Sequence, residues 1–377
     1  MITDQRTRPA SSSSTRETSV ISRRIQHPSW TEWQVTLQGS GHSSFRLEQL
    51  EAFLNASGTA TLNTDFFGLD QRMASLSGER RREGIAESET TLLLPDYDGG
   101  GVQIGKLSGG RSTPIFDRDR IIGRYFEDSD AKYCWLGGVL PWDPAASREV
   151  QTQQVLEIIR KSLAQAGMHF RDIVRTWFYN DRILDWYDVF NRVRTAFFKQ
   201  HSIVCLPAST GIGAPNSAGA ALVAKVFAVL PRTRNVAVTP VRSPLQCEAS
   251  TYGSSFSRAM EVRDASGRTL YISGTASIAP AGKTAHVGNT AKQIETTMEV
   301  IGALFEEADM VLSDTTRAIA YFRHAGDIAL WHDYCRRKQL PALPIILIPA
   351  YVCRDDLLFE IELDASRPND AANRLEI

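Results

Sequence analysis

The sequence predicts an α+β protein built from two tandem domains, each a mixed sheet with two helices on one face. An internal repeat is the first observation behind this prediction. Residues 151–194 align without a gap on residues 293–336, at a shift of 142, with ten identical positions. The second observation is that each copy gives the same order of elements, β-β-α-β-α-β-β. Such a unit folds as one layer of strands covered by one layer of helices.

Each copy of the repeat begins with a helix, because its apolar residues recur at helical spacing. In the first copy these residues are Val155, Ile158, Ile159 and Leu163. A strand follows at 173–179 in the first copy and at 315–322 in the second. A second helix is then expected at 186–198 and at 328–337.

Further strands complete each copy. The apolar segments 220–229 and 357–363 are the strand candidates that follow the second helix. Ahead of the second copy, segments 256–262 and 269–278 indicate a hairpin, with its turn at 264–267. The hairpin supplies the two strands that begin the unit in the second copy.

These elements divide the chain into an N-terminal domain at 25–240 and a C-terminal domain at 241–377. Residues 1–24 are polar and Ser-rich, so we expect them to form a disordered tail. Segment 41–46 (GHSSFR) faintly echoes 253–258 (GSSFSR). We expect segment 41–46 to be the first strand of the N-terminal domain, separated from the rest by a long insertion.

Composition excludes several classes of partner. The chain has 42 basic and 43 acidic residues, which gives no electrostatic reason to expect binding to nucleic acid. Its apolar runs are shorter than the ~20 residues needed to cross a bilayer, so we expect no membrane partner. The five cysteines and seven histidines lack the spacing of a disulfide framework or a metal site. A reducing compartment, the cytoplasm, fits this pattern.

Several short motifs resemble the Rid (YjgF-like) family, whose domains have a chorismate-mutase-like fold. They are residues 271–274 (YISG), 255–259 (SFSRA), 190–194 (FNRVR) and 206–209 (LPAS). The substrate-binding arginine of that family's last motif is absent here, because Ser209 stands at its place. This departure argues against ordinary imine deaminase chemistry.

Longer segments resemble the chorismatases, over roughly residues 130–365. They are residues 207–213 (PASTGIG), 252–258 (YGSSFSR), 273–277 (SGTAS) and 352–360 (VCRDDLLFE). The resemblance implies two tandem Rid-like domains, the N-terminal one degenerate, with most of the active site in the C-terminal one. It also implies that chorismate is the small-molecule substrate and is split into pyruvate and a C7 carboxylic acid. No metal or cofactor is implied, and the chain would be a monomer or a homotrimer.

Glu360 is the candidate general acid. In the strand around 357–364, Phe359 and Ile361 point toward the helices, whereas Glu360 and Glu362 point to the opposite face. In a tandem arrangement that face packs against the neighbouring domain. Burial there raises the pKa of a carboxyl, and a protonated carboxyl is what cleavage of an enol ether requires. Glu360 has no repeat copy and lies in a family motif, so we choose it over Glu362.

Cys353 is the second catalytic candidate. A covalent nucleophile needs a nearby base, and no histidine lies close to Cys353 in the sequence. By resemblance, a cysteine here accompanies chorismatases that form 3-hydroxybenzoate. We therefore expect Cys353 to shape the pocket and steer the product rather than to attack the substrate.

Arg258 is the candidate carboxylate anchor, because chorismate carries two carboxylates and Arg258 has no clear repeat copy. Two neighbouring segments are further candidates for substrate binding. In the glycine-rich segment, closely spaced backbone N–H groups and a hydroxyl could hold an anion. The residues concerned are Thr210, Gly211 and Gly213, together with Tyr252 and Gly253.

The repeat also identifies residues that are expected to serve the fold. Asp172, Arg175 and Arg194 each have an identical partner in the second copy, so we interpret them as structural, Arg194 with the least certainty. Three other functions stay open. They are hydrolysis of chorismate to a dihydroxycyclohexadiene carboxylate, Rid-type imine deamination, and metabolite binding without catalysis.

Overall fold

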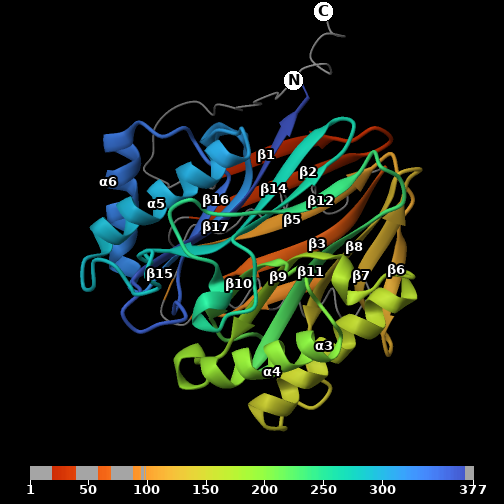
Figure 1. Ribbon diagram of the computed structural model, residues 1–377, viewed down its shortest axis with the longest axis horizontal. Helices are drawn as coiled ribbons and strands as arrows, with labels where there is room; N and C mark the ends of the chain where they lie inside the picture. Colours follow the sequence, from red (N-terminus) through yellow and green to blue (C-terminus); the bar gives the residue numbers. More distant parts are fainter. Residues whose placement is uncertain (1–18, 40–57, 69–87, 95–96, 98, 370–377) are drawn as a thin grey trace, which may run out of the picture.

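The computed structural model describes residues 19–39, 58–68, 88–94, 97 and 99–369, except for the side chains of Ser250 and Tyr252. Its strands form three sheets that face one another, and helices α3 to α6 lie on the outside (Figure 1). The α+β class is therefore confirmed. No helix in these ranges is long and apolar enough to cross a bilayer.

The first sheet is five-stranded and has the order β1-β2-β5-β3-β4. Its strands are β1 (Ser19–Gln26), β2 (Thr31–Gly39), β3 (Thr59–Phe67), β4 (Glu89–Leu92) and β5 (Gly100–Ser108).

The second sheet is six-stranded, with the order β10-β9-β11-β8-β7-β6. Its strands are β6 (Thr113–Asp117), β7 (Arg120–Glu127), β8 (Ala131–Val139), β9 (Ile173–Asn180), β10 (Ala208–Gly213) and β11 (Leu222–Pro231). Its helices are α3 (Arg148–Gln165) and α4 (Tyr187–Gln200), with single turns η1 (Phe170–Asp172) and η2 (Ile183–Asp185).

The third sheet is also six-stranded, with the order β12-β13-β14-β17-β15-β16. Its strands are β12 (Ala237–Val241), β13 (Ala259–Arg263), β14 (Gly267–Ala276), β15 (Thr315–Phe322), β16 (Ile345–Pro349) and β17 (Phe359–Pro368). Its helices are α5 (Thr290–Glu307) and α6 (Ile328–Lys338), with turns η3 (Ala249–Tyr252), η4 (Leu312–Asp314) and η5 (Ala325–Asp327).

The internal repeat is confirmed. Helix α3 and strand β9 begin at 148 and 173, and α5 and β15 begin 142 residues later, at 290 and 315. One pair of identical residues makes the same contact in both copies. Gln151 on α3 accepts a hydrogen bond from the backbone of Ala221, just before β11, and Gln293 on α5 accepts one from Leu358, just before β17. Each glutamine therefore ties its first helix to the last strand of its unit.

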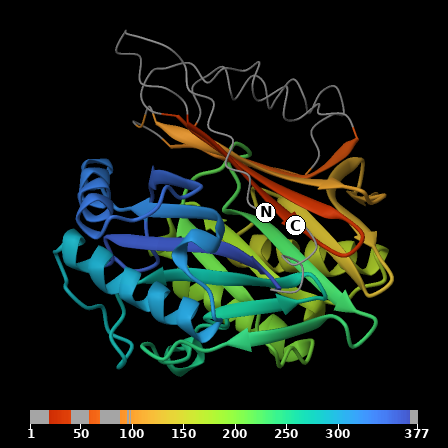
Figure 2. The same cartoon turned by 90° about the horizontal axis from the view of Figure 1, so that it is seen from above.

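The core occupies both faces of the two six-stranded sheets. Helices cover the outer faces, whereas the inner faces of all three sheets meet in a common core. Residues from each sheet are buried there: Phe67 from the first, Trp135 and Trp177 from the second, Tyr271 and Tyr321 from the third. Figure 2 shows the first sheet, in red and orange, lying along one side of the other two.

The structure corrects the predicted domain organisation. The region taken as an insertion forms a separate five-stranded sheet, so the chain has three sheets rather than two. Residues 19–24 are not a tail, because β1 pairs with β2 along its whole length despite its polar sequence. Strand β12 pairs with β13, so residues 237–240 belong to the third sheet and not to the N-terminal domain. Segment 41–46 lies outside the described residues.

Candidate active site

Three acidic side chains point from β17 into the space between the sheets. Glu360, Glu362 and Asp364 alternate with Phe359, Ile361 and Leu363, and all six are buried. The apolar three pack against the helices of the third sheet, as the alternation predicted. The acidic three face the second sheet. Their environments differ, and this difference gives them different protonation states.

Glu362 is held as a carboxylate. Arg317 donates a hydrogen bond of 2.5 Å to one oxygen of Glu362, and Arg175 donates one of 2.9 Å to the other. The indole of Trp177 donates a third, also at 2.9 Å. Burial alone would raise the pKa of Glu362, but the charges of Arg317 and Arg175 outweigh it and hold the pKa below its usual value. Glu362 is thus the centre of a structural ion-pair cluster.

Glu360 has the opposite character. It is 4% exposed, and its pKa is raised to about 8. Burial is the main cause, and the negative charge of Glu362 adds to it. The positive charges of Arg175 and Arg258 lower the pKa, but by less than burial and Glu362 raise it. Within the described residues no hydrogen bond holds the Glu360 carboxyl. At neutral pH this group is therefore a buried carboxylic acid with a proton to donate.

A small cavity of about 60 Å³ lies in front of Glu360, between the second and third sheets. Helix α4 and strand β10 form one wall, and β14, β17 and the segment before β13 form the other. The lining residues are Tyr187, Arg194, Ser209, Gly211, Ser254, Phe256, Arg258, Gly274, Ala276, Ile278, Cys353, Arg354, Leu357 and Glu360.

Arg258 lines this cavity and is 3% exposed. It lies directly before β13 rather than inside a strand. Its Nε and Nη2 donate hydrogen bonds of 3.0 and 2.6 Å to the carbonyl of Cys247, which fixes the plane of the guanidinium. The positive charge of Arg258 lies close enough to Glu360 to lower the pKa of that carboxyl.

Arg194 is a second arginine that lines this cavity, although the repeat predicted a structural role for it. It is 2% exposed and donates hydrogen bonds to Asn191, at 2.7 Å, and to Ser209, at 3.3 Å. Its repeat counterpart Arg336 is exposed and pairs with Asp333. The two arginines therefore lie in different environments, because Arg194 lines the cavity and Arg336 lies on the surface.

Asp172 and Arg175 have the structural roles expected of them. Asp172 accepts a hydrogen bond of 2.7 Å from the backbone of His169, and its counterpart Asp314 accepts one from Val311. Arg175 is fully buried and bridges Glu362 and Thr210.

The glycine-rich segment is strand β10 and not an anion-binding loop. Thr210 points away from the cavity lining and accepts hydrogen bonds from Arg175, at 2.6 Å, and from the backbone of Gly274, at 3.0 Å. The backbone of Gly213 pairs with Tyr351. Only Gly211 of the three predicted residues lines the cavity. The backbone N–H groups of Ser209 and Gly213, which face away from β9, are already hydrogen-bonded to Ser273 and Tyr351.

The other predicted residues have mixed placements. Cys353 lines the cavity, and burial, with a contribution from the negative charge of Glu360, raises the pKa of its thiol to about 12. The thiol therefore stays protonated and is a poor nucleophile. Gly253 is exposed, in the turn after η3, and is not among the lining residues. Tyr252 ends η3, and its side chain lies outside the described part of the chain.

Comparisons with known proteins agree with this architecture. Residues 122–224, which span most of the second sheet and its helices, match the family described as Endoribonuclease L-PSP. A 3-hydroxybenzoate synthase from Streptomyces hygroscopicus is 25% identical over 262 residues, covering 62% of this chain and 74% of the relative. A crystal structure of a chorismatase has a TM-score of 0.65 at 17% identity and covers 89% of this chain and 98% of its own. The chain therefore contains an L-PSP-type unit, shares the fold of a chorismatase and is similar in sequence to a 3-hydroxybenzoate synthase.

Proposed function

We propose that this protein is a chorismatase that releases pyruvate from chorismate and forms 3-hydroxybenzoate. The observation that supports this most strongly is the protonated Glu360 carboxyl, which faces a buried cavity beside the guanidinium groups of Arg194 and Arg258. Chorismate presents two carboxylates and an acid-labile enol ether. The cavity lining offers arginine side chains for the carboxylates and one acid for the enol ether.

The proposed reaction begins when Glu360 gives its proton to the methylene carbon of the enolpyruvyl group. The ether carbon becomes oxocarbenium-like, the bond from the ether oxygen to the ring breaks, and pyruvate departs. The neighbouring ring hydroxyl oxygen then bonds to the vacated ring carbon and forms an epoxide, and its proton returns to the Glu360 carboxylate. The epoxide isomerises to the phenol, so no water is consumed.

Substrate entry requires the cavity to widen. Its volume of about 60 Å³ is smaller than a chorismate molecule. Ser254, Phe256 and Arg258 belong to one wall, in a segment whose only strand pairing among the described residues is an isolated bridge at Ser257. We infer that this segment moves outward on binding and brings Arg258 back against the substrate.

The basic test is a coupled assay. The full chain is mixed with chorismate, and released pyruvate is followed through lactate dehydrogenase. Turnover of chorismate with stoichiometric pyruvate supports the proposal. Turnover of imines in place of chorismate, or binding of chorismate without pyruvate release, contradicts it.

The source of the phenol oxygen distinguishes the two chorismatase reactions. We expect Cys353, as part of the cavity wall, to favour attack by the ring hydroxyl over attack by water. In oxygen-18 water the aromatic product should therefore contain no label in its phenol, as measured by mass spectrometry. A labelled phenol, or a dihydroxycyclohexadiene carboxylate as the sole product, shows that water is the nucleophile.

Gly274 is needed for the position of Glu360. A methyl group at this glycine would lie 2.0 Å from Oε1 of Glu360 and 3.3 Å from Thr210. Gly274→Ala should therefore displace the acid and lower kcat at least about tenfold, the effect of roughly 1.4 kcal/mol on the barrier. Gly302→Ala is the control, because no atom lies within 4 Å of the added methyl. Equal activity of the two variants would remove Gly274 from the mechanism.

A further inference from the structure

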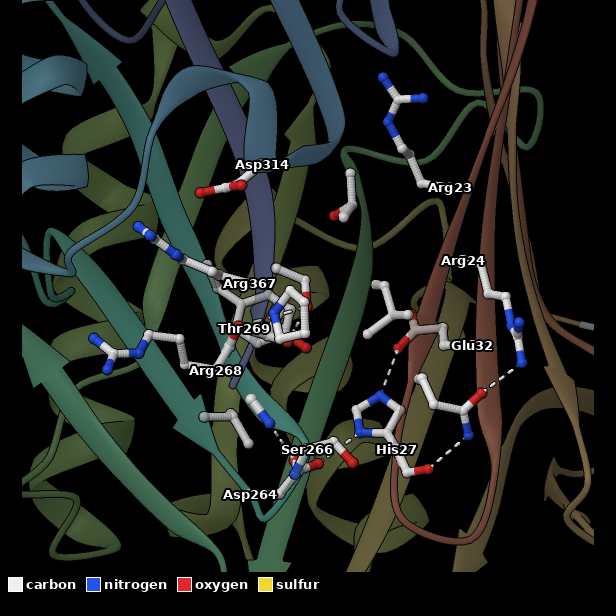
Figure 3. Close-up of a pocket in the computed structure, with 18 of the residues that line it drawn as sticks. Arg23, Arg24, His27, Glu32, Asp264, Ser266, Arg268, Thr269, Asp314 and Arg367 are labelled. Atoms are coloured by element: carbon white, nitrogen blue, oxygen red, sulfur yellow. Dashed lines mark hydrogen bonds and ion pairs between the residues drawn. The ribbon is translucent and has the colours of Figure 1, made fainter. Parts of the chain in front are cut away.

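A second, larger cavity of about 400 Å³ lies at the other end of the β14–β17 pair (Figure 3). These strands are antiparallel, and Ala276 pairs with Glu360 at the end that forms the small cavity. At the opposite end, Thr269 pairs with Ser366, and both line the large cavity. The Glu362 ion-pair cluster lies between the two ends. The two cavities have no lining residue in common.

The large cavity has an aromatic floor to which all three sheets contribute. The floor forms where the inner faces of the sheets converge, and its residues belong to the common core. They are Trp30, Tyr133, Phe227, Val262 and Tyr271. A volume of about 400 Å³ and an apolar floor are typical of sites for small organic molecules.

The walls of this cavity are cationic. Arg23 and Arg24 come from β1, Arg268 from β14 and Arg367 from β17, as Figure 3 shows. His27 adds a fifth basic group. Burial opposes its protonation, but hydrogen bonds and charges from Asp264 and Glu32 outweigh burial and raise its pKa.

The acidic groups of the cavity are already engaged within the protein. Asp264 hydrogen-bonds His27 at 2.7 Å and accepts a second hydrogen bond from the backbone of Ser266. Glu32 accepts a hydrogen bond from Gln34, and Asp314 accepts one from Val311. With three acidic against five basic side chains, the cavity has an excess of positive charge.

Arg23 is the basic group best placed to meet a ligand. Along β1 it points to the same side as Ile25 and His27, because strand side chains alternate. Its Nε is buried and has no hydrogen-bond partner among the described residues. Each of the other arginines donates a hydrogen bond within the protein: Arg24 to Gln26, Arg268 to the carbonyl of Ala308 and Arg367 to the carbonyl of Asp309.

We propose that this cavity is a second ligand site, for a small carboxylic acid that carries a flat apolar ring. The ring would cover the aromatic floor around Tyr271, and the carboxylate would pair with Arg23. This site does not depend on the reaction proposed for Glu360. It gives the chain a place to bind a ring-bearing acid that is separate from the site of chemistry.

The test is calorimetric titration of the full chain with 2-naphthoate, comparing matched arginine variants. Arg23→Ala should weaken binding at least about tenfold, because it removes the only charge-assisted partner proposed for the carboxylate. Arg336→Ala is the control, because Arg336 is exposed, pairs with Asp333 and lies outside the cavity, and it should stay within about twofold of the natural chain. Arg258→Ala, in the small cavity, should also bind normally.

Hydrogen exchange of the natural chain gives a readout that does not depend on any variant. Added 2-naphthoate should protect segments 19–27 and 264–271 and leave 353–360 unchanged. Absence of saturable binding up to millimolar concentration would overturn the proposal. So would binding that is lost in Arg258→Ala and retained in Arg23→Ala, because the probe would then occupy the Glu360 cavity.

Discussion

Glu360→Gln is expected to lower pyruvate release at least about 100-fold, the usual scale for loss of a general acid. Glutamine preserves the shape of the side chain but has no proton to give to the enolpyruvyl carbon. Substrate analogues should bind the variant with nearly unchanged affinity, since Arg194 and Arg258 are intact. The measurement is kcat in the pyruvate assay, together with the Kd of an analogue. Near-normal turnover would mean that the proton comes from another group.

The pH dependence provides an independent readout of the same group. The pKa of Glu360 is raised to about 8, so the acid is protonated and competent below that pH. We expect kcat of the natural enzyme to fall as pH rises through about 8. The residual activity of Glu360→Gln should lack this decrease.

The same shift has a consequence for stability. A carboxyl whose pKa is higher in the folded state makes folding less favourable as pH rises from about 4.5 to about 8. At pH 7 this cost is about 3 kcal/mol. Glu360→Gln removes this cost and should raise the melting temperature. Such a gain is expected where a protein buries an ionisable group for function at the expense of stability.

Glu362→Gln is the matched comparison, two residues further along β17. Its carboxylate is paired with Arg175 and Arg317, so the substitution leaves the buried Arg175 without its counterion and Arg317 with Asp364 alone. A loss of roughly 3–5 kcal/mol in the free energy of unfolding is expected. Turnover per folded molecule should fall much less than in Glu360→Gln. A stable Glu362→Gln without activity, beside an active Glu360→Gln, would reverse our assignment of the acid.

Much of this site could be predicted because two local patterns are strong. The repeat predicted the helices α3, α4, α5 and α6 and the strands β9, β11, β15 and β17. Strand alternation put Glu360 on the buried inner face. Burial between two sheets then explains its raised pKa. The choice between Glu360 and Glu362 depended on the absence of a repeat copy and on the family motif. The structure adds a physical difference, since only Glu362 is paired with arginines.

The parts that could not be predicted depend on contacts between distant segments. The first sheet has no copy in the repeat, and the polar strand β1 is held by its pairing with β2. Arg194 was taken as structural because its counterpart Arg336 is identical. Whether such an arginine is buried depends on what packs against its helix, and no pattern within the repeat records that. The resemblance of residues 190–194 to a Rid-family motif did draw attention to Arg194, but we gave more weight to its identity with Arg336 in the repeat.

Arg258→Ala is expected to raise KM by about 30- to 900-fold, equivalent to a loss of roughly 2–4 kcal/mol of a charge-assisted contact. The substrate carboxylate would lose a guanidinium that the carbonyl of Cys247 holds in place. The effect on kcat should be smaller, because the acid remains. Arg194→Ala should behave similarly, whereas Arg336→Ala, at the exposed repeat counterpart of Arg194, should have natural kinetics.

A second measurement separates substrate binding by Arg258 from a purely structural role. The charge of Arg258 lowers the pKa of Glu360, so its removal should raise that pKa further. The alkaline decrease in kcat should therefore move to higher pH in Arg258→Ala and return toward its original position in Arg258→Lys. A variant that merely loosens the fold would admit water to the cavity and shift the decrease to lower pH. An unchanged KM together with an unshifted profile would place Arg258 outside the site.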